Sequence, residues 1–286
     1  MDYAERTARI RALGRTIEPA VLEAAQAIFT PQHETEPYDG VRVTRDVRYG
    51  AHDRHRLDVY APDPAGAKRP VLLFVHGGGF TGGDKKRPGT PYQDNVALWA
   101  VRHGMVGINM TYRLAPAAPW PAGIEDIAAA IAWIRANGAA HGGDAGRIFL
   151  MGTSAGATHV ACYAAGRSPE IAGAIMLSGV YDLETTEPRD SLKSYFGADI
   201  PAWSARSPLR GLIDGAVPLM FVLAEFDPPD FERQALAAVS AFSARHGRWP
   251  HFVRLMGHNH FTATLHLNTD DDYLGRQIVE FVAAAS

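Results

Sequence analysis

Short apolar runs, bounded by glycine or proline, constrain the fold of this chain more than any other feature of its sequence. Such runs suit strands that are buried on both faces of a parallel sheet, because helices cover both sides of that kind of sheet. Val253 and Leu255 supply one further candidate strand. The main runs are Val71–Val75, Met105–Met110, Arg147–Met151, Ala174–Leu177 and Pro218–Leu223.

Stretches of helical composition alternate with these runs along the chain. Most of them stop at or just before a glycine, the residue that most readily takes the left-handed conformation at a helix end. Strands that alternate with helices predict an α/β fold with a mostly parallel sheet flanked by helices. The helical stretches are Tyr92–His103, Ile124–Ala136, Ala155–Ala165, Phe231–His246 and Leu274–Ala285.

The N-terminal part of the chain has a different pattern. Residues 2–30 are expected to be helical with a break at Gly14, because apolar side chains recur every three or four positions. From Val41 onward apolar and polar residues alternate, which predicts two more strands and a sheet of about eight strands. We therefore expect a helical extension at residues 1–37 and an α/β domain at residues 38–286.

Composition excludes several classes of protein. Hydrophobic residues make up 47% and charged residues 21%, which is ordinary for a globular chain with a core. A net charge of −3 argues against a generally basic nucleic-acid binder, and the single cysteine, Cys162, rules out an internal disulfide. No apolar run approaches the roughly 20 residues of a membrane helix, and no apolar segment follows Met1. The expected location is therefore the cytoplasm, with no membrane partner.

The pentapeptide Gly152-Thr153-Ser154-Ala155-Gly156 carries the strongest chemical signal. It lies between an expected strand and an expected helix, which is the context of a nucleophilic serine held on a tight turn. Glycine is expected two residues before and two residues after the serine, because larger side chains there would collide with the neighbouring strand and helix. Ser154 is therefore the candidate nucleophile, and a chance match of the motif is the alternative.

The segment His76-Gly77-Gly78-Gly79-Phe80 follows an expected strand directly. Consecutive glycines let backbone N–H groups approach a ligand closely, and such donors stabilise a developing oxyanion. The candidate donors are the N–H groups of Gly78, Gly79 and Ala155, whereas His76 is interpreted as an architectural residue. A phosphate-binding loop is the alternative, but the Lys-Ser or Lys-Thr that it needs after its last glycine is absent.

A serine nucleophile needs a base and a group that orients the base. Asp227 comes just after an expected strand and is the candidate acid, with Glu225 and Asp230 as rivals. One of two later histidines should be the base, and His260 is favoured over His258. The spacing of these histidines also suits a metal, but no cysteine or acidic cluster follows closely enough to complete a site. We expect no metal and no other cofactor.

Taken together, these motifs resemble those of α/β-hydrolase-fold serine esterases of the hormone-sensitive-lipase type and of their arylformamidase-like relatives. The resemblance runs from about Val41 to the C-terminus and implies Ser154 as nucleophile, His260 as base and Asp227 as the orienting acid. It also implies that the N-terminal helices and the segment 181–216 form a small helical cap over the pocket. The matching segments are residues 76–80, 112–116, 120–126, 152–156, 227–228 and 259–261.

The sequence therefore predicts a serine carboxylesterase that cleaves small short-acyl or aromatic esters through an acyl-enzyme on Ser154. An amidase or arylformamidase with the same triad is the first alternative, and a non-catalytic ligand-binding protein of this fold is the second. The expected partner is a small ester or amide, and a homodimer is left open. The candidate substrate-binding residues are Phe80, Tyr195, Phe196 and Trp203.

Overall fold

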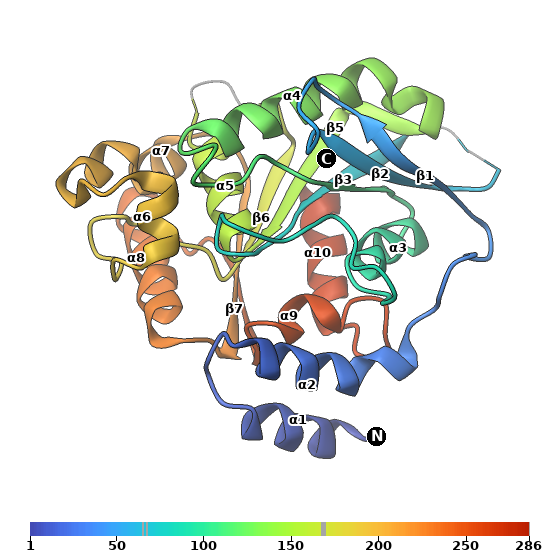
Figure 1. Cartoon of the computed structure of the whole chain (residues 1–286), viewed down its shortest axis with the longest axis horizontal. Helices are drawn as coiled ribbons and strands as arrows, with labels where there is room; N and C mark the ends of the chain where they lie inside the picture. Colours follow the sequence, from blue (N-terminus) through green and yellow to red (C-terminus); the bar gives the residue numbers. More distant parts are fainter. Residues whose placement is uncertain (65, 67, 167–169, 286) are drawn as a thin grey trace.

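One eight-stranded sheet organises the chain in the computed structural model, which describes residues 1–64, 66, 68–166 and 170–285 (Figure 1). The strand order is β1-β2-β4-β3-β5-β6-β7-β8, and β2 alone runs in the direction opposite to the other strands of this sheet. The predicted mostly parallel sheet of about eight strands is thus confirmed. The strands are β1 (Val41–Arg48), β2 (Arg56–Pro62), β3 (Arg69–Val75), β4 (Val106–Met110), β5 (Gly143–Thr153), β6 (Gly173–Leu177), β7 (Leu219–Phe226) and β8 (His251–Asn259).

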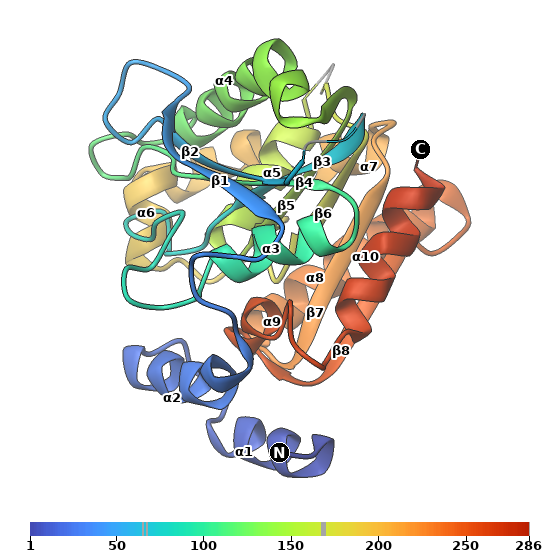
Figure 2. The ribbon, with the colours of Figure 1, turned by 90° about the vertical axis from the view of Figure 1, so that its right-hand side faces the viewer.

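Helices cover both faces of this sheet, as Figures 1 and 2 show. Alternate side chains of β3 enter two different cores: Leu73 packs with residues of α4, α5 and α8, and Phe74 packs with residues of α3 and α10. This two-sided burial explains why the central strands are apolar at nearly every position. These helices are α3 (Asp94–Arg102), α4 (Ala122–Asn137), α5 (Ala155–Ala164), α8 (Pro229–His246) and α10 (Tyr273–Ala284).

The N-terminal segment forms two helices, α1 (Tyr3–Ala12) and α2 (Pro19–Phe29), with the predicted break at Gly14 between them. Helix α1 packs against β8, and α2 packs against the short helix α9 (Thr262–Leu265). Figure 2 shows α2 beside α9 and α1 further out, at one end of the sheet. The extension therefore lies next to the segment that carries His260. A 3-10 turn, η1 (Thr30–Gln32), follows α2, and another, η2 (Gly138–His141), follows α4.

The segment 181–216 forms three short helical elements, and its described residues contain no strand, as expected. They are α6 (Asp190–Phe196), η3 (Ile200–Arg206) and α7 (Leu209–Asp214). Among the described helices, none combines the length and the apolar character that crossing a bilayer would require.

The sheet register brings the sequence motifs together. Val75, the last residue of β3, pairs with Gly152 of β5, and Thr153 pairs with Leu177 at the end of β6. The glycine-rich loop after β3 and the serine after β5 are therefore neighbours. In open parallel sheets ligands bind beyond the carboxyl ends of the strands, and this is where the candidate residues gather.

Candidate active site

Ser154 lies on the turn between β5 and α5 in a strained conformation, with φ of 55° and ψ of −123°. Its N–H donates to the carbonyl of Leu177, 2.8 Å away. A Cβ atom on Gly152 would come within 2.4 Å of the carbonyl oxygen of Gly156, and one on Gly156 within 2.1 Å of the carbonyl oxygen of Val75. Both flanking glycines are therefore required for the steric reason expected from the sequence.

His260 and Asp227 form a buried hydrogen-bonded pair. The Nδ1 atom of His260 lies 2.7 Å from Oδ1 of Asp227, and the side chains are 4% and 0% exposed. Since a carboxylate oxygen only accepts, Nδ1 carries the proton and Nε2 keeps a free lone pair. Among the described residues, this buried Nε2 has no hydrogen-bond partner. The imidazole is thus held in the tautomer that a general base requires.

The second oxygen of Asp227 is also fully used. It accepts hydrogen bonds from Oγ of Ser178 at 2.6 Å and from the N–H of Ala224 at 2.7 Å. Ser178 takes a left-handed φ of 50°, which is uncommon for a residue with a side chain. Sequence reasoning assigned no role to Ser178, and the contact depends on β6 and β7 ending side by side, which no local motif reveals.

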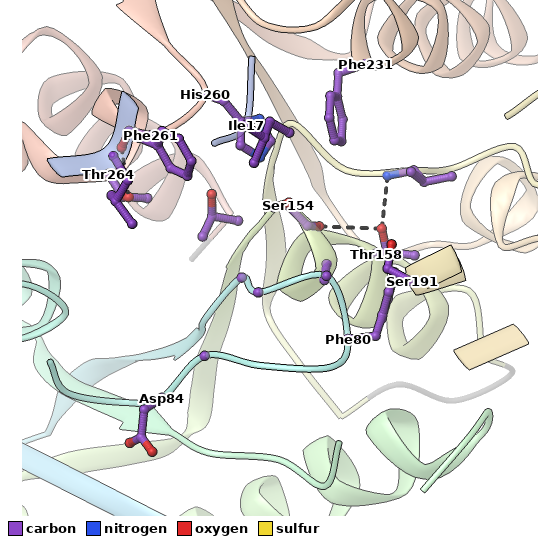
Figure 3. A pocket seen from close by; sticks show the side chains of 18 of the residues that line it. Ile17, Phe80, Asp84, Ser154, Thr158, Ser191, Phe231, His260, Phe261 and Thr264 are labelled. Atoms are coloured by element: carbon purple, nitrogen blue, oxygen red, sulfur yellow. Dashed lines mark hydrogen bonds between the residues drawn. The ribbon is translucent and has the colours of Figure 1, made fainter. Parts of the chain in front are cut away.

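A cavity of about 390 Å³ joins Ser154 to His260. Figure 3 shows these two residues and Phe231 around the same space, with Phe261 on one side and Phe80 on the other. Ile17 and Leu22 reach the cavity from the N-terminal segment, whose helices were expected to form part of the cap. The other side chains that line it include Arg87, Tyr92, Thr158, Val180, Arg189, Ser191, Leu192, Thr264 and Leu265.

The candidate oxyanion donors Gly78, Gly79 and Ala155 line the same cavity as Ser154. Gly78 and Gly79 have φ values of 128° and 60°, and a Cβ on Gly78 would lie 2.2 Å from the carbonyl oxygen of Gly82. The loop can therefore take this path only with glycine at position 78.

His76 is buried beneath the glycine-rich loop, with Nδ1 2.6 Å from the carbonyl oxygen of Gly77 and its ring stacked on Tyr112 at 4.3 Å. Burial lowers the pKa of His76 to about 3, so the ring stays neutral in the folded protein. These contacts favour the architectural interpretation of His76 over a role as base.

The aromatic residues predicted for the pocket divide into two groups. Phe80 lines the cavity, whereas Tyr195, Phe196 and Trp203 are buried behind it and are not among its described lining residues. Phe80 stacks on Tyr195 with ring centroids 4.8 Å apart, so the other aromatics support the wall rather than form it. From the segment 181–216, the cavity instead receives the side chains of Arg189, Ser191 and Leu192.

The rival candidates contact other partners. Glu225 accepts the N–H of Gly257 at 2.7 Å, and Asp230 accepts a hydrogen bond from Thr186 at 2.9 Å. His258 contacts Oδ2 of Asp271 through Nε2 at 3.1 Å and Thr262 through Nδ1 at 3.2 Å. None of these three rivals lines the cavity in the described part of the chain.

One group of side chains has the composition of a metal site. His258, His266 and Asp271 place one potential ligand atom each within 4.8 Å of one another. However, Nη2 of Arg6 lies 2.9 Å from the same Asp271 oxygen that contacts His258. A guanidinium at that position puts a permanent positive charge where a cation would bind, so this group is better described as a hydrogen-bonded network.

Comparison with known proteins finds a matching family model and similar curated proteins. A family model described as alpha/beta hydrolase fold matches residues 72–261. The chain is 32% identical over 201 residues to "Esterase LipQ" of Mycobacterium tuberculosis, covering 65% of this chain and 47% of that protein. It is 39% identical over 113 residues to "Carboxylesterase NlhH" of the same organism, covering 39% and 34% of the two chains. This chain thus spans about half or less of the length of these curated relatives.

Solved structures agree with the fold. Esterase B from Lactobacillus rhamnosis superimposes with a TM-score of 0.75 at 18% identity, covering 99% of this chain and 96% of that one. A thermostable esterase from Pseudomonas putida gives a TM-score of 0.68 at 21% identity, covering 99% and 94%. At these identities the similarity establishes the shared fold alone.

Proposed function

The chain belongs to the alpha/beta hydrolase fold family, and on that premise we propose that it is a carboxylic ester hydrolase with Ser154 as its nucleophile. The observation that carries this proposal is one cavity lined by a strained serine, a histidine paired with a buried aspartate, and a glycine-rich loop. The two curated relatives described above, an esterase and a carboxylesterase, support the same class of reaction.

In the proposed mechanism, Nε2 of His260 takes the proton of the Ser154 hydroxyl while Oγ of Ser154 attacks the carbonyl carbon of the ester. The carbonyl oxygen becomes an oxyanion, which accepts hydrogen bonds from the N–H groups of Gly78, Gly79 and Ala155. Asp227 stabilises the imidazolium through Nδ1. The C–O bond then breaks, and the departing alcohol takes the proton from Nε2.

The resulting acyl-enzyme is cleaved by water in the second half of the reaction. His260 removes a proton from the water, the oxygen attacks the acyl carbon, and the bond to Ser154 breaks as its oxygen regains the proton. Every step uses groups of this chain and water alone. The cavity of about 390 Å³ suits small short-acyl or aromatic esters. We propose that Ile17 and Leu22 form part of a cap over it.

The test compares hydrolysis of p-nitrophenyl acetate, butyrate and octanoate by the wild-type protein and by Ser154→Ala, with an aryl formamide in parallel. Because the triad acts as a unit, we expect Ser154→Ala to lower kcat by about 10⁴- to 10⁶-fold. Ser191→Ala is the matched control, since it also removes a hydroxyl from the cavity wall and should retain activity. Wild-type-like ester turnover by Ser154→Ala would refute the proposal, and faster formamide than ester cleavage would favour the amidase alternative.

A further inference from the structure

We propose that the physiological substrate carries a carboxylate and that Arg189 binds it, an inference that rests on the proposed esterase function. Arg189 lines the cavity that contains Ser154 and His260. Its guanidinium carbon lies 5.3 Å from the centre of the Phe231 ring, and that ring lies 4.6 Å from the ring of His260. A positive charge therefore sits one aromatic side chain away from the candidate base.

The guanidinium of Arg189 is only partly used inside the protein. Nη2 lies 3.1 Å from Oδ2 of Asp230, and Nε has no partner among the described residues. Asp230 itself also accepts hydrogen bonds from Thr186 and Arg233, at 2.9 Å and 3.2 Å. One buried carboxylate is thus shared by two guanidinium groups. The Arg189 side chain is 36% exposed and belongs to the cavity lining, whereas its Nε atom is buried.

The rest of the cavity does not neutralise this charge. Asp84 is the one carboxylate among the described lining residues, and it is already engaged by the N–H of Lys85 at 2.8 Å and by Arg54 at 3.6 Å. Arg87 adds a second cation to the wall, and no ion pair of its side chain occurs within the described residues. Much of the remaining wall is apolar, and charges interact more strongly there than in bulk water.

An alternative is that Arg189 merely anchors the segment 181–216 to α8 through Asp230. The two roles differ in what they predict for catalysis. Loss of an anchor would change the stability of the protein and the turnover of all substrates together. Loss of an anion-binding group would raise KM for charged substrates and leave matched neutral substrates nearly unchanged.

The experiment uses two matched substrate pairs, one for each arm of the ester. p-Nitrophenyl hydrogen adipate and p-nitrophenyl hexanoate differ by a carboxylate on the acyl arm. 4-Acetoxybenzoate and its methyl ester differ by a carboxylate on the alcohol arm. Variants Arg189→Met and Arg189→Lys are compared with Lys193→Met, which removes an exposed cation from the same segment, outside the described cavity lining.

We expect the wild-type protein to prefer the charged member of at least one pair, and added salt to weaken that preference. Arg189→Met should lower the ratio of kcat/KM values, charged over neutral, by about 10- to 100-fold, mainly through KM. Arg189→Lys should restore part of the loss, and Lys193→Met should change nothing. The wild-type ratio and its salt dependence need no variant, so they test whether the cavity favours a carboxylate even if Arg189→Met folds poorly, and Arg189→Lys then tests the assignment to Arg189.

The inference is wrong if the wild-type protein prefers the neutral member of both pairs, or if Arg189→Met slows both members equally. In either case, turnover of the neutral esters that still depends on Ser154 leaves the proposed function standing. If no substrate of either pair shows Ser154-dependent turnover, the proposed function fails, and this inference fails with it.

Discussion

The carboxylate of Asp227 shows how single residues hold the candidate site. One oxygen contacts His260, and the other accepts hydrogen bonds from Ser178 and the N–H of Ala224. Because all of these contacts lie inside the protein, rotating the imidazole out of the cavity would break a charge-assisted hydrogen bond in a buried place. The free lone pair of Nε2 is thereby kept on the side of the ring away from Asp227.

The two histidines of the segment 258–260 allow a test of which residue is the base. His260→Ala should lower kcat by several orders of magnitude, because it removes the proposed base. His258→Ala should lower kcat far less and should mainly lower the melting temperature, since Asp271 and Thr262 lose a buried partner. Steady-state kinetics and thermal unfolding of both variants measure the two effects. A larger loss of kcat in His258→Ala would show that the base is assigned to the wrong residue.

Residues carried by a local motif were predictable from the sequence, and residues defined by tertiary contact were not. Ser154 lies in a glycine-flanked turn, and Asp227 and His260 each follow an expected strand, so all three were candidates from the sequence, with other acids and a second histidine as rivals. Ser178 meets Asp227 across 49 residues of chain, and Arg189 meets Asp230 across 41. No local sequence pattern around Ser178 or Arg189 predicts these contacts.

At the level of elements, the N-terminal helical segment contributes side chains to the cavity wall. The link between α1 and α2 carries Arg15, whose Nε donates to the carbonyl oxygen of Asp227 at 2.7 Å. The same link places Ile17 in the cavity wall, and α2 adds Leu22. A segment from the start of the chain is therefore bonded to the loop that holds the candidate acid.

The preference for acyl chain length should depend on α2. Leu22→Ala should raise the ratio of octanoate to acetate turnover by about threefold or more, because each methylene buried in the added space is worth about 0.8 kcal/mol. Leu22→Trp should lower the same ratio by filling that space. Leu236→Ala is the matched control, since Leu236 is exposed on α8 and outside the described cavity lining. Unchanged ratios in both Leu22 variants would show that α2 does not bound the substrate.

The long elements could be predicted because their buried apolar residues form continuous runs or recur at regular spacing in the sequence. Each of the five apolar runs became a strand of the sheet, and the N-terminal break fell at Gly14. Helices α6, α7 and α9 are only 7, 6 and 4 residues long. At those lengths a helix is stabilised by what it packs against rather than by its own pattern, so the bounds of these three helices could not be predicted from the sequence.

For the molecule as a whole, three buried histidines couple folding to pH. Burial lowers the pKa of His76, His159 and His266 to about 3 in each case. The ring of His159 illustrates the cause, because it packs edge-on against Phe80 and Tyr195, and neither of its nitrogens has a partner among the described residues. A protonated imidazole at such a place would carry an unsolvated charge.

The sign of the effect follows from linkage. An unfolded histidine titrates near pH 6.5, so between about pH 6.5 and 3 the unfolded chain binds protons that the folded protein excludes. Stability therefore falls as the pH is lowered through this window, and each of the three histidines contributes about 1.4 kcal/mol per pH unit once it is protonated only in the unfolded state. Above about pH 6.5 these groups are neutral in both states and contribute no slope.

The measurement is the free energy of urea unfolding at pH 7, 6, 5 and 4 for the wild-type protein and for His159→Phe. Phenylalanine keeps an aromatic ring of similar size and cannot be protonated. Below pH 6, the slope of the free energy of unfolding against pH should therefore correspond to about one proton fewer than in the wild-type protein. His52→Gln, at an exposed histidine, is the matched control. The slope is a difference between pH values, so it remains informative even if His159→Phe is less stable throughout. An undiminished slope in His159→Phe would show that His159 is protonated as readily in the folded protein as in the unfolded chain.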